Sequence, residues 1–154
     1  NIKKIVLPEG IKIIETGAFA DMTSLREINI PETVEEIEDV AFYQSVSIKS
    51  IIIPESVKKI GGYAFANCKK LGFVKICGAE EIGAGAFRAT PSLKALELPA
   101  SLKRILSSME KYKYMDAAAI DSFSSVTVRC PKGSCAEEYC KKHMIKFEYS
   151  PEKK

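Results

Sequence analysis

Histidine is nearly absent from this chain: among its 154 residues, His143 is the single histidine. A hydrolase triad needs an imidazole as its general base, and the sequence predicts His143 inside a C-terminal helix. No GxxxxGK[ST] phosphate-binding loop is present either, and the nearest glycine cluster, GAGAF at 83–87, is more simply a tight turn. These absences predict that the chain is not an enzyme.

Long apolar runs and blocks of one charge sign are also missing. No stretch approaches the roughly 18–20 apolar residues needed to cross a membrane, and the opening NIKKIVLPEG lacks the apolar core of a signal peptide. The formal net charge is +3, from 23 basic and 20 acidic residues mixed along the chain. We therefore expect no nucleic-acid partner and no membrane insertion by this segment, with any export signal lying outside it.

Paired CxxC motifs are absent as well. The five cysteines are an odd number, which argues against a disulfide framework; they are Cys68, Cys77, Cys130, Cys135 and Cys140. The last three precede His143 with the spacing CxxxxCxxxxCxxH, which matches none of the common zinc patterns. We expect packed or exposed thiols and no cofactor, with a metal- or thiol-dependent site at Cys140 and His143 as a remote alternative.

What the chain does have is an internal repeat. Phenylalanines preceded by alanine recur at intervals of 23, 23 and 22 residues, at Phe19, Phe42, Phe65 and Phe87. Prolines and isoleucines keep the same period, in the columns Pro8, Pro31, Pro54 and Pro99, and Ile14, Ile37, Ile60, Ile82 and Ile105. Cys77 stands at the proline position of the fourth unit. Four full units and a fifth, altered one can be counted. Such a period predicts a solenoid, because stacked units bury a core that one unit alone cannot form.

Each unit opens with a short extended segment. These segments are IKKIVLP (2–8), LREINIP (25–31), IKSIIIP (48–54), LGFVKIC (71–77) and LKALELP (93–99). Proline ends the strand because it has no amide hydrogen to donate to a ladder. Alternation points side chains such as Ile28 and Ile30 inward. Strands of successive units are then expected to pair side by side in one parallel sheet.

Charged residues before each column isoleucine change sign from unit to unit. The series runs Lys12, Glu35 and Glu36, Lys58 and Lys59, Glu80 and Glu81, Lys103 and Arg104. Opposite charges then lie on adjacent rungs, whereas a slip of one unit would set like charges together. We interpret the series as a solvated structural ladder rather than a ligand site.

The units IPETVEEIEDVAF and IPESVKKIGGYAFANCKKL resemble the BspA-like leucine-rich repeat family, whose pattern runs Leu-x-x-Ile-x-Ile-Pro, Val-x-x-Ile and Ala-Phe. The resemblance covers residues 2 to about 105. It implies an extracellular or cell-surface protein of the kind found in host-associated anaerobes, implicated in adhesion and protein binding, with no common enzymatic activity. A protein or extracellular-matrix ligand is the partner that this resemblance implies.

The C-terminal segment VRCPKGSCAEEYCKKHMIKFEY looks like the terminal cap that often follows such arrays. Ser134 and Glu137 form a capping box, which predicts a helix from about Cys135 to Lys142. IKFEY at 145–149 is expected to form a closing strand. We therefore divide the chain into a repeat array at 1–130 and a cap at 131–154. Because the chain begins inside a repeat, we expect it to be a fragment of a longer array.

The fifth unit departs from the family pattern. An Ala-Phe pair is expected near residue 110, but LSSMEKYKYMDAAAIDSF stands there instead, an insertion of roughly ten residues near 106–118. Insertions in repeat arrays map to loops and often carry binding. Tyr112 and Tyr114 are therefore candidate contacts, and a local helix that patches an irregular last repeat is the alternative.

The outward face of the predicted main sheet is the other candidate binding surface. By alternation its side chains are Lys4, Val6, Glu27, Asn29, Ser50, Ile52, Phe73, Lys75, Ala95 and Glu97. Ile52 and Phe73 are apolar there without a packing role, so they are candidate anchors for a protein partner. The alternative is that they are strand-forming residues exposed singly.

Together these features predict an α/β protein: a right-handed leucine-rich-repeat solenoid with a parallel concave sheet and a C-terminal helix-strand cap. The leading functional hypothesis is a non-enzymatic scaffold for protein binding or adhesion, secreted or at the bacterial cell surface. A structural spacer that displays another domain is the alternative. The identity of the ligand and the oligomeric state are left open by the sequence.

Overall fold

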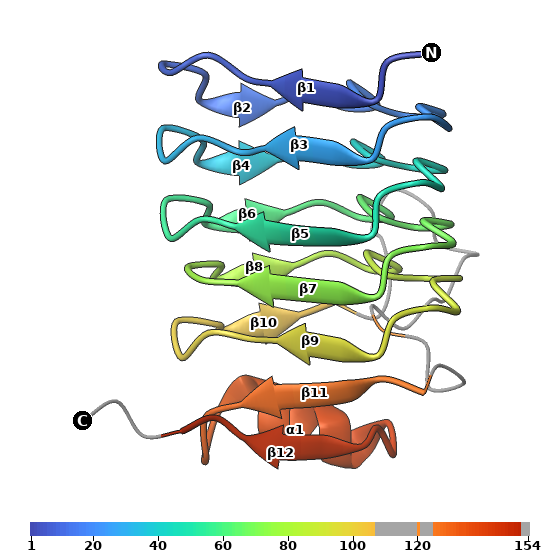
Figure 1. Ribbon diagram of the computed structural model, residues 1–154. Helices are drawn as coiled ribbons and strands as arrows, with labels where there is room; N and C mark the ends of the chain where they lie inside the picture. The colour runs from blue at the N-terminus through green and yellow to red at the C-terminus, as the bar shows by residue number, and fades with distance from the viewer. Residues whose placement is uncertain (107–119, 121–124, 152–154) are drawn as a thin grey trace.

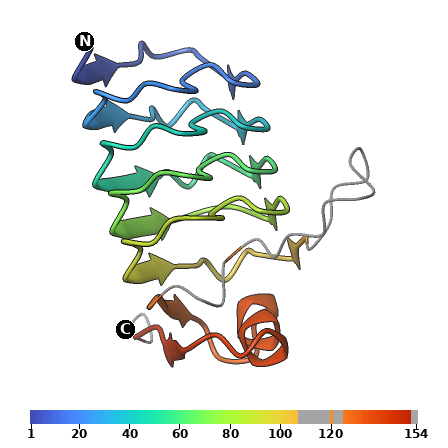
Figure 2. The ribbon, with the colours of Figure 1, turned by 90° about the vertical axis from the view of Figure 1, so that its right-hand side faces the viewer.

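The protein is a ladder of stacked turns. In the computed structural model, which describes residues 1–106, 120 and 125–151, the chain forms a solenoid of about six turns with its described ends at opposite ends of the stack (Figure 1). Each turn of the repeat array adds one strand to a main sheet, and most turns add a shorter strand to a second sheet behind it (Figure 2). The predicted solenoid is confirmed.

The main-sheet strands lie where the extended segments were predicted. They are β1 (Lys4–Val6), β3 (Glu27–Asn29), β5 (Ser50–Ile53), β7 (Phe73–Ile76), β9 (Ala95–Glu97), β11 (Thr127–Cys130) and β12 (Phe147–Tyr149). Every described pairing between them is parallel, as predicted. Strands β5, β7, β9, β11 and β12 are hydrogen-bonded in that order, whereas β1 and β3 pair only with each other.

The second sheet is continuous over residues 13–105. It is formed by β2 (Ile13–Ile14), β4 (Glu36–Ile37), β6 (Lys59–Ile60), β8 (Glu81–Ile82) and β10 (Arg104–Ile105). The predicted charge ladder forms ion pairs at three of its four steps: Lys12 pairs with Glu35 at 2.6 Å, Lys59 with Glu36 at 2.8 Å and Lys103 with Glu80 at 2.6 Å, and Arg104 pairs with Glu81. At the remaining step, between Lys58 or Lys59 and Glu80 or Glu81, the described residues form no ion pair. All four pairs join adjacent rungs, which confirms stacking in sequence order.

The core fills the space between the sheets and the Ala-Phe turns. Ring centroids of Phe19 and Phe42 lie 5.2 Å apart, those of Phe42 and Phe65 4.9 Å and those of Phe65 and Phe87 5.6 Å, all in stacked geometry. Ile120 forms a parallel bridge with Phe87 and is buried, so it continues the column beyond the insertion. Ile120 thus takes the place of the phenylalanine of the Ala-Phe pair expected near residue 110.

Turns around each phenylalanine repeat one backbone conformation. The residue two places before it has a positive φ in every full unit, at Gly17, Val40, Tyr63 and Gly85, and so does the residue two places after it, at Asp21, Gln44, Asn67 and Ala89. Valine strongly disfavours this region. Val40 is held there by hydrogen bonding to the next rung, because its amide donates to the carbonyl oxygen of Gly62 at 2.9 Å. Stacking of the repeat units therefore overrides the backbone preference of the single residue.

The α/β description needs correction for the repeats. Residues 1–106 contain no helix, and the helix of the structure is α1 (Cys135–Lys142), which has the predicted bounds and lies beside the last strands (Figure 2). Short strands and tight turns occupy the back of each unit, since Ile14 and its counterparts alternate with charged residues rather than following a helical period. The repeats thus form a β-solenoid.

Candidate functional site

The ten residues predicted for the outward face of the main sheet form two rows on that sheet. Strand register places Ser50 beside Phe73 and Phe73 beside Ala95 in one row, with Lys4 beside Glu27 above them. The other row holds Ile52, Lys75 and Glu97, with Val6 beside Asn29 above them. Both rows are interrupted between β3 and β5, which do not pair.

Two aliphatic side chains project from this face. Val6 is 69% exposed and Ile52 is 61% exposed, although both lie within β-strands. Phe73 is only half-buried, and it lies opposite Ser50 rather than Ile52. Ile52 is therefore the more accessible of the two candidate anchors, and Phe73 sits diagonally from it in the other row.

Charged residues of the same face are largely paired with one another. Lys4 lies 3.2 Å from Glu27, Lys75 lies 3.9 Å from Glu97, and Arg129 lies 3.2 Å from Glu97. Arg129 also approaches Glu148 on β12 at 3.7 Å. Sequence reasoning missed Arg129 and Glu148, although the alternation in VTVRC already places Arg129 on the outward side. Ion pairs at such exposed positions contribute little stability, so the face can exchange them for contacts with a partner.

The tyrosines Tyr112 and Tyr114 of the insertion lie outside the described residues. Their proposed role in binding stays a prediction from the sequence.

The cysteines are not arranged as a catalytic centre. Burial raises the pKa of the Cys68 and Cys140 thiols to about 12, and it also raises the pKa of Cys77, Cys130 and Cys135. A nucleophilic cysteine needs the opposite shift, because the thiolate is the reactive form. Within the described part of the chain, no group of three or more histidine, cysteine or acidic side chains is placed to hold a metal ion.

His143 is the C-cap of α1 and packs against Tyr139, with ring centroids 4.3 Å apart and ring planes tilted by 30°. This contact gives the single histidine a packing role at the end of the helix.

Comparison with known families identifies the repeat type. The sequence profile described as BspA type leucine rich repeat region matches residues 1–115, in six copies. The chain belongs to the BspA-type leucine-rich repeat family. The resemblance seen in the sequence is thereby confirmed, while a search of curated proteins found no match.

Solved structures of bacterial proteins share this BspA-type fold. The pneumococcal vaccine antigen PcpA is 27% identical, with a TM-score of 0.69 over 97% of this chain and 36% of its own. The leucine-rich repeat protein TpLRR of T. pallidum is also 27% identical, with a TM-score of 0.54 over 63% of this chain and 59% of its own. The present BspA-type chain therefore spans about a third of PcpA and less than two thirds of TpLRR.

Proposed function

We propose that the protein is a non-enzymatic scaffold that binds another protein or an extracellular-matrix component through the outward face of its main sheet. The observation that carries this proposal is the exposure of Ile52 and Val6 on the outward side of parallel strands. Soluble proteins bury aliphatic side chains where they can, and an exposed apolar group rimmed by polar residues is typical of a binding surface.

A bacterial cell-surface or secreted location is part of the proposal. It is supported by membership of the BspA-type family and by the description of the similar PcpA as a vaccine antigen. No helix in the described residues is long and apolar enough to cross a membrane.

We further propose that the solenoid is right-handed and that its main sheet is the concave side. Parallel strands joined by a crossover are almost always connected in the right-handed sense. A concave sheet would present the two rows of side chains to one partner surface.

Substitution of the exposed anchor tests the binding face. Ile52→Lys should weaken binding at least tenfold to any extracellular-matrix protein of a purified, immobilised panel that the wild-type chain binds. Ile13→Lys is the matched control, because Ile13 is also an exposed strand isoleucine but lies on the second sheet. Surface plasmon resonance would report both affinities, and equal loss in the two variants would contradict the proposed face.

The alternative function, a spacer that displays another domain, predicts a different result. In that case this segment would bind no protein of the panel, because the partner would contact residues outside it.

A further inference from the structure

A row of basic residues lies along the edge of the main sheet where its strands begin, at the right-hand ends of the arrows in Figure 1. In four of the five repeat units, the residue before the first outward side chain of the strand is lysine or arginine. The fourth unit has Gly72 at this position and two lysines shortly before it. All six basic side chains are exposed. This basic row consists of Lys3, Arg26, Lys49, Lys69, Lys70 and Lys94.

Backbone hydrogen bonds hold the row in register. The carbonyl oxygen of Lys3 accepts a bond from the amide of Arg26 at 2.8 Å. The carbonyl oxygen of Lys49 accepts from Gly72 at 2.8 Å, and that of Gly72 accepts from Lys94 at 3.0 Å. The step from Arg26 to Lys49 crosses the break between β3 and β5. The third to fifth rungs are therefore bonded consecutively at this edge, and bonded strands lie about 4.8 Å apart.

The positive charge of the row is not balanced by the described part of the chain. None of the six side chains forms an ion pair with a described residue. On the third to fifth rungs, the segments that lead into the strands, 44–50, 67–73 and 89–95, contain no aspartate or glutamate. Four lysines of the row lie in these segments. Unpaired positive charge is therefore concentrated on these three rungs.

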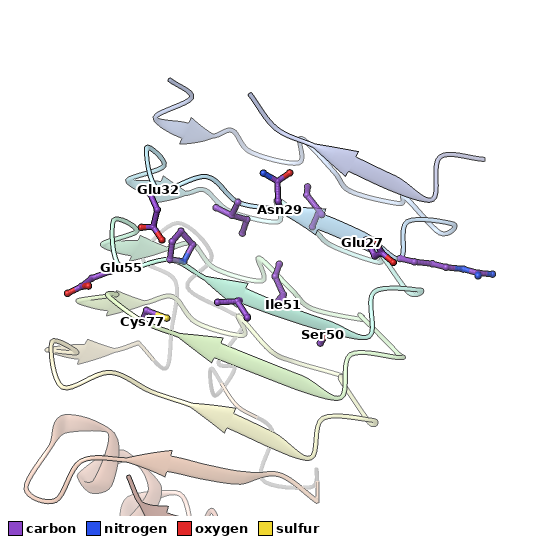
Figure 3. A pocket seen from close by; sticks show the side chains of 12 residues that line it. Glu27, Asn29, Glu32, Ser50, Ile51, Glu55 and Cys77 are labelled. Carbon is purple, nitrogen blue, oxygen red and sulfur yellow. The ribbon is translucent and has the colours of Figure 1, made fainter. Parts of the chain in front are cut away.

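The second rung is less positive at the same edge. Asp21 accepts a hydrogen bond from Gln44 Nε2 at 2.7 Å, and Glu27 pairs with Lys4 at 3.2 Å. Figure 3 shows Glu27 at the start of β3, and Ser50 at the start of β5 takes its place on the next rung. The change from glutamate to serine marks where the row loses its acidic neighbours.

Repetition of one charge sign distinguishes this row from the second sheet. There, ion pairs such as that of Lys12 with Glu35 join adjacent rungs of opposite sign. Like charges on neighbouring strands are destabilising, and the spacing of bonded rungs is shorter than the Debye length of about 8 Å at physiological salt. The basic row therefore lowers stability, so a purely structural role does not account for it.

We propose that the basic row binds a linear sulfated polysaccharide whose chain runs along the axis of the stack. Lys49, Lys70 and Lys94 contact sulfate groups on neighbouring sugars of this chain. A linear polyanion fits because the cations form a line across several rungs, whereas a single small anion reaches only part of it. Lysine ammonium groups are flexible point charges, so they follow sulfate groups without a fixed geometry.

The surface fits a nucleic acid less well. Binding of a single strand combines positive charge with aromatic side chains on which the bases stack. The segments 46–50, 69–73 and 91–95 contain one aromatic residue, the half-buried Phe73. The inference goes beyond the proposed protein-binding face, because neither Ile52 nor Val6 belongs to the row.

Heparin is the probe that tests the proposal. Isothermal titration at about 0.15 M salt should show binding that weakens steeply as salt is added, because binding to a polyanion releases its counterions. Changing Lys49, Lys70 and Lys94 together to glutamine should weaken binding at least tenfold. The matched control removes the same charge from three exposed lysines outside the row, and its affinity should stay within threefold of wild type. These control lysines are Lys58, Lys132 and Lys142.

Position 72 allows a gain-of-function test. A Cβ on Gly72 would meet no atom closer than 3.5 Å, and its φ angle is not positive. Gly72→Lys should therefore fold normally, complete the row on the fourth rung and raise the affinity for heparin at least twofold. Gly72→Gln is the control, because it adds a long side chain without the charge. Its affinity should equal that of wild type.

Other polyanions identify the class of ligand. Chemically desulfated heparin should bind at least tenfold more weakly than heparin, and so should hyaluronan, which carries carboxylates but no sulfates. A single-stranded DNA oligonucleotide that binds as tightly as heparin would assign the row to nucleic acid instead.

Three further outcomes would overturn the inference. These are no binding of heparin at about 0.15 M salt, equal weakening in the row variant and its matched control, and no gain from Gly72→Lys. The proposed protein-binding face is tested separately. If the triple lysine variant binds heparin as wild type does while Ile52→Lys abolishes binding of a matrix protein, only the polysaccharide site is lost. The reverse result would leave the basic row without the protein-binding face.

Discussion

At the scale of single residues, Gly61 shows how stacking creates requirements that one repeat does not reveal. Its counterparts in the first two units are Glu15 and Glu38, so alignment of the repeats gives no reason for glycine there. Its φ angle is not positive, in agreement with the expectation that no special backbone angle is needed. The reason is the neighbouring rung: a Cβ on Gly61 would lie 2.4 Å from the backbone nitrogen of Asp39.

We expect Gly61→Ala to destabilise the protein by about 1–3 kcal/mol, because the added methyl group overpacks two backbones that cannot separate freely. Gly72→Ala is the control, since its Cβ would meet no atom closer than 3.5 Å. Urea unfolding followed by circular dichroism measures both. Equal stability of the two variants would show that the rungs separate without cost at this position.

At the scale of elements, Glu137 ties α1 to its surroundings. Its carboxylate accepts hydrogen bonds from the amide of Gly133 at 2.6 Å and the hydroxyl of Tyr149 at 3.1 Å, and it pairs with Lys141 at 2.6 Å. Ser134 accepts from the amide of Glu137 at 3.3 Å, as the capping box predicts. In a capping box the glutamate side chain also accepts a hydrogen bond from the backbone amide of the N-cap residue, here Ser134. Glu137 instead accepts from the backbone amide of Gly133. These contacts, with Lys141 as the largest cause, lower the pKa of Glu137.

The lowered pKa of Glu137 predicts a pH dependence of folding. A carboxylate whose pKa is depressed in the folded state stabilises the protein above its unfolded pKa, about 4.3, and this stabilisation is lost as the pH falls through the folded value. Glu137→Gln should therefore lower the midpoint of thermal unfolding at pH 7 and reduce its fall on acidification. Glu138→Gln, in the same helical turn and exposed, is the control. An identical pH profile in both variants would contradict this role.

At the scale of the whole molecule, each rung contacts mainly its neighbours in the stack. Stability of such an array is close to a sum of unit and interface terms, so an uncovered end is its weakest point. The C-terminal end is covered by α1, which contacts β10 and β11, and by β12, which pairs with β11. Ala136 and Cys140 of α1 are fully buried in this contact.

Removal of residues 131–154 should therefore expose the edge of β11 and the core beneath α1. We expect a lower midpoint of urea unfolding and concentration-dependent association, because an uncovered strand edge pairs with other chains. Removal of 151–154 alone is the control. Multi-angle light scattering and urea titration measure the effect, and a monomeric, equally stable chain ending at Cys130 would show that the predicted cap is dispensable.

The sequence by itself determined the solenoid, its parallel strands and the charge ladder. The repeat period, the position of proline and the alternation of side chains along a strand can all be seen within the repeat pattern. The places of Phe42, Glu36 and Ile51 could therefore be predicted from that pattern. The helix at Cys135–Lys142 followed from its N-cap for the same reason. The ten outward residues of the main sheet also followed from alternation alone.

Only the tertiary structure decided how tightly successive rungs approach. The half-burial of Phe73, the need for glycine at position 61 and the use of Ile120 in the phenylalanine column depend on contacts between units. The break in the main sheet between β3 and β5 has the same origin. Its strands carry the same pattern as their neighbours, but whether two such strands pair depends on the fit of both complete rungs, which a pattern within one rung does not contain.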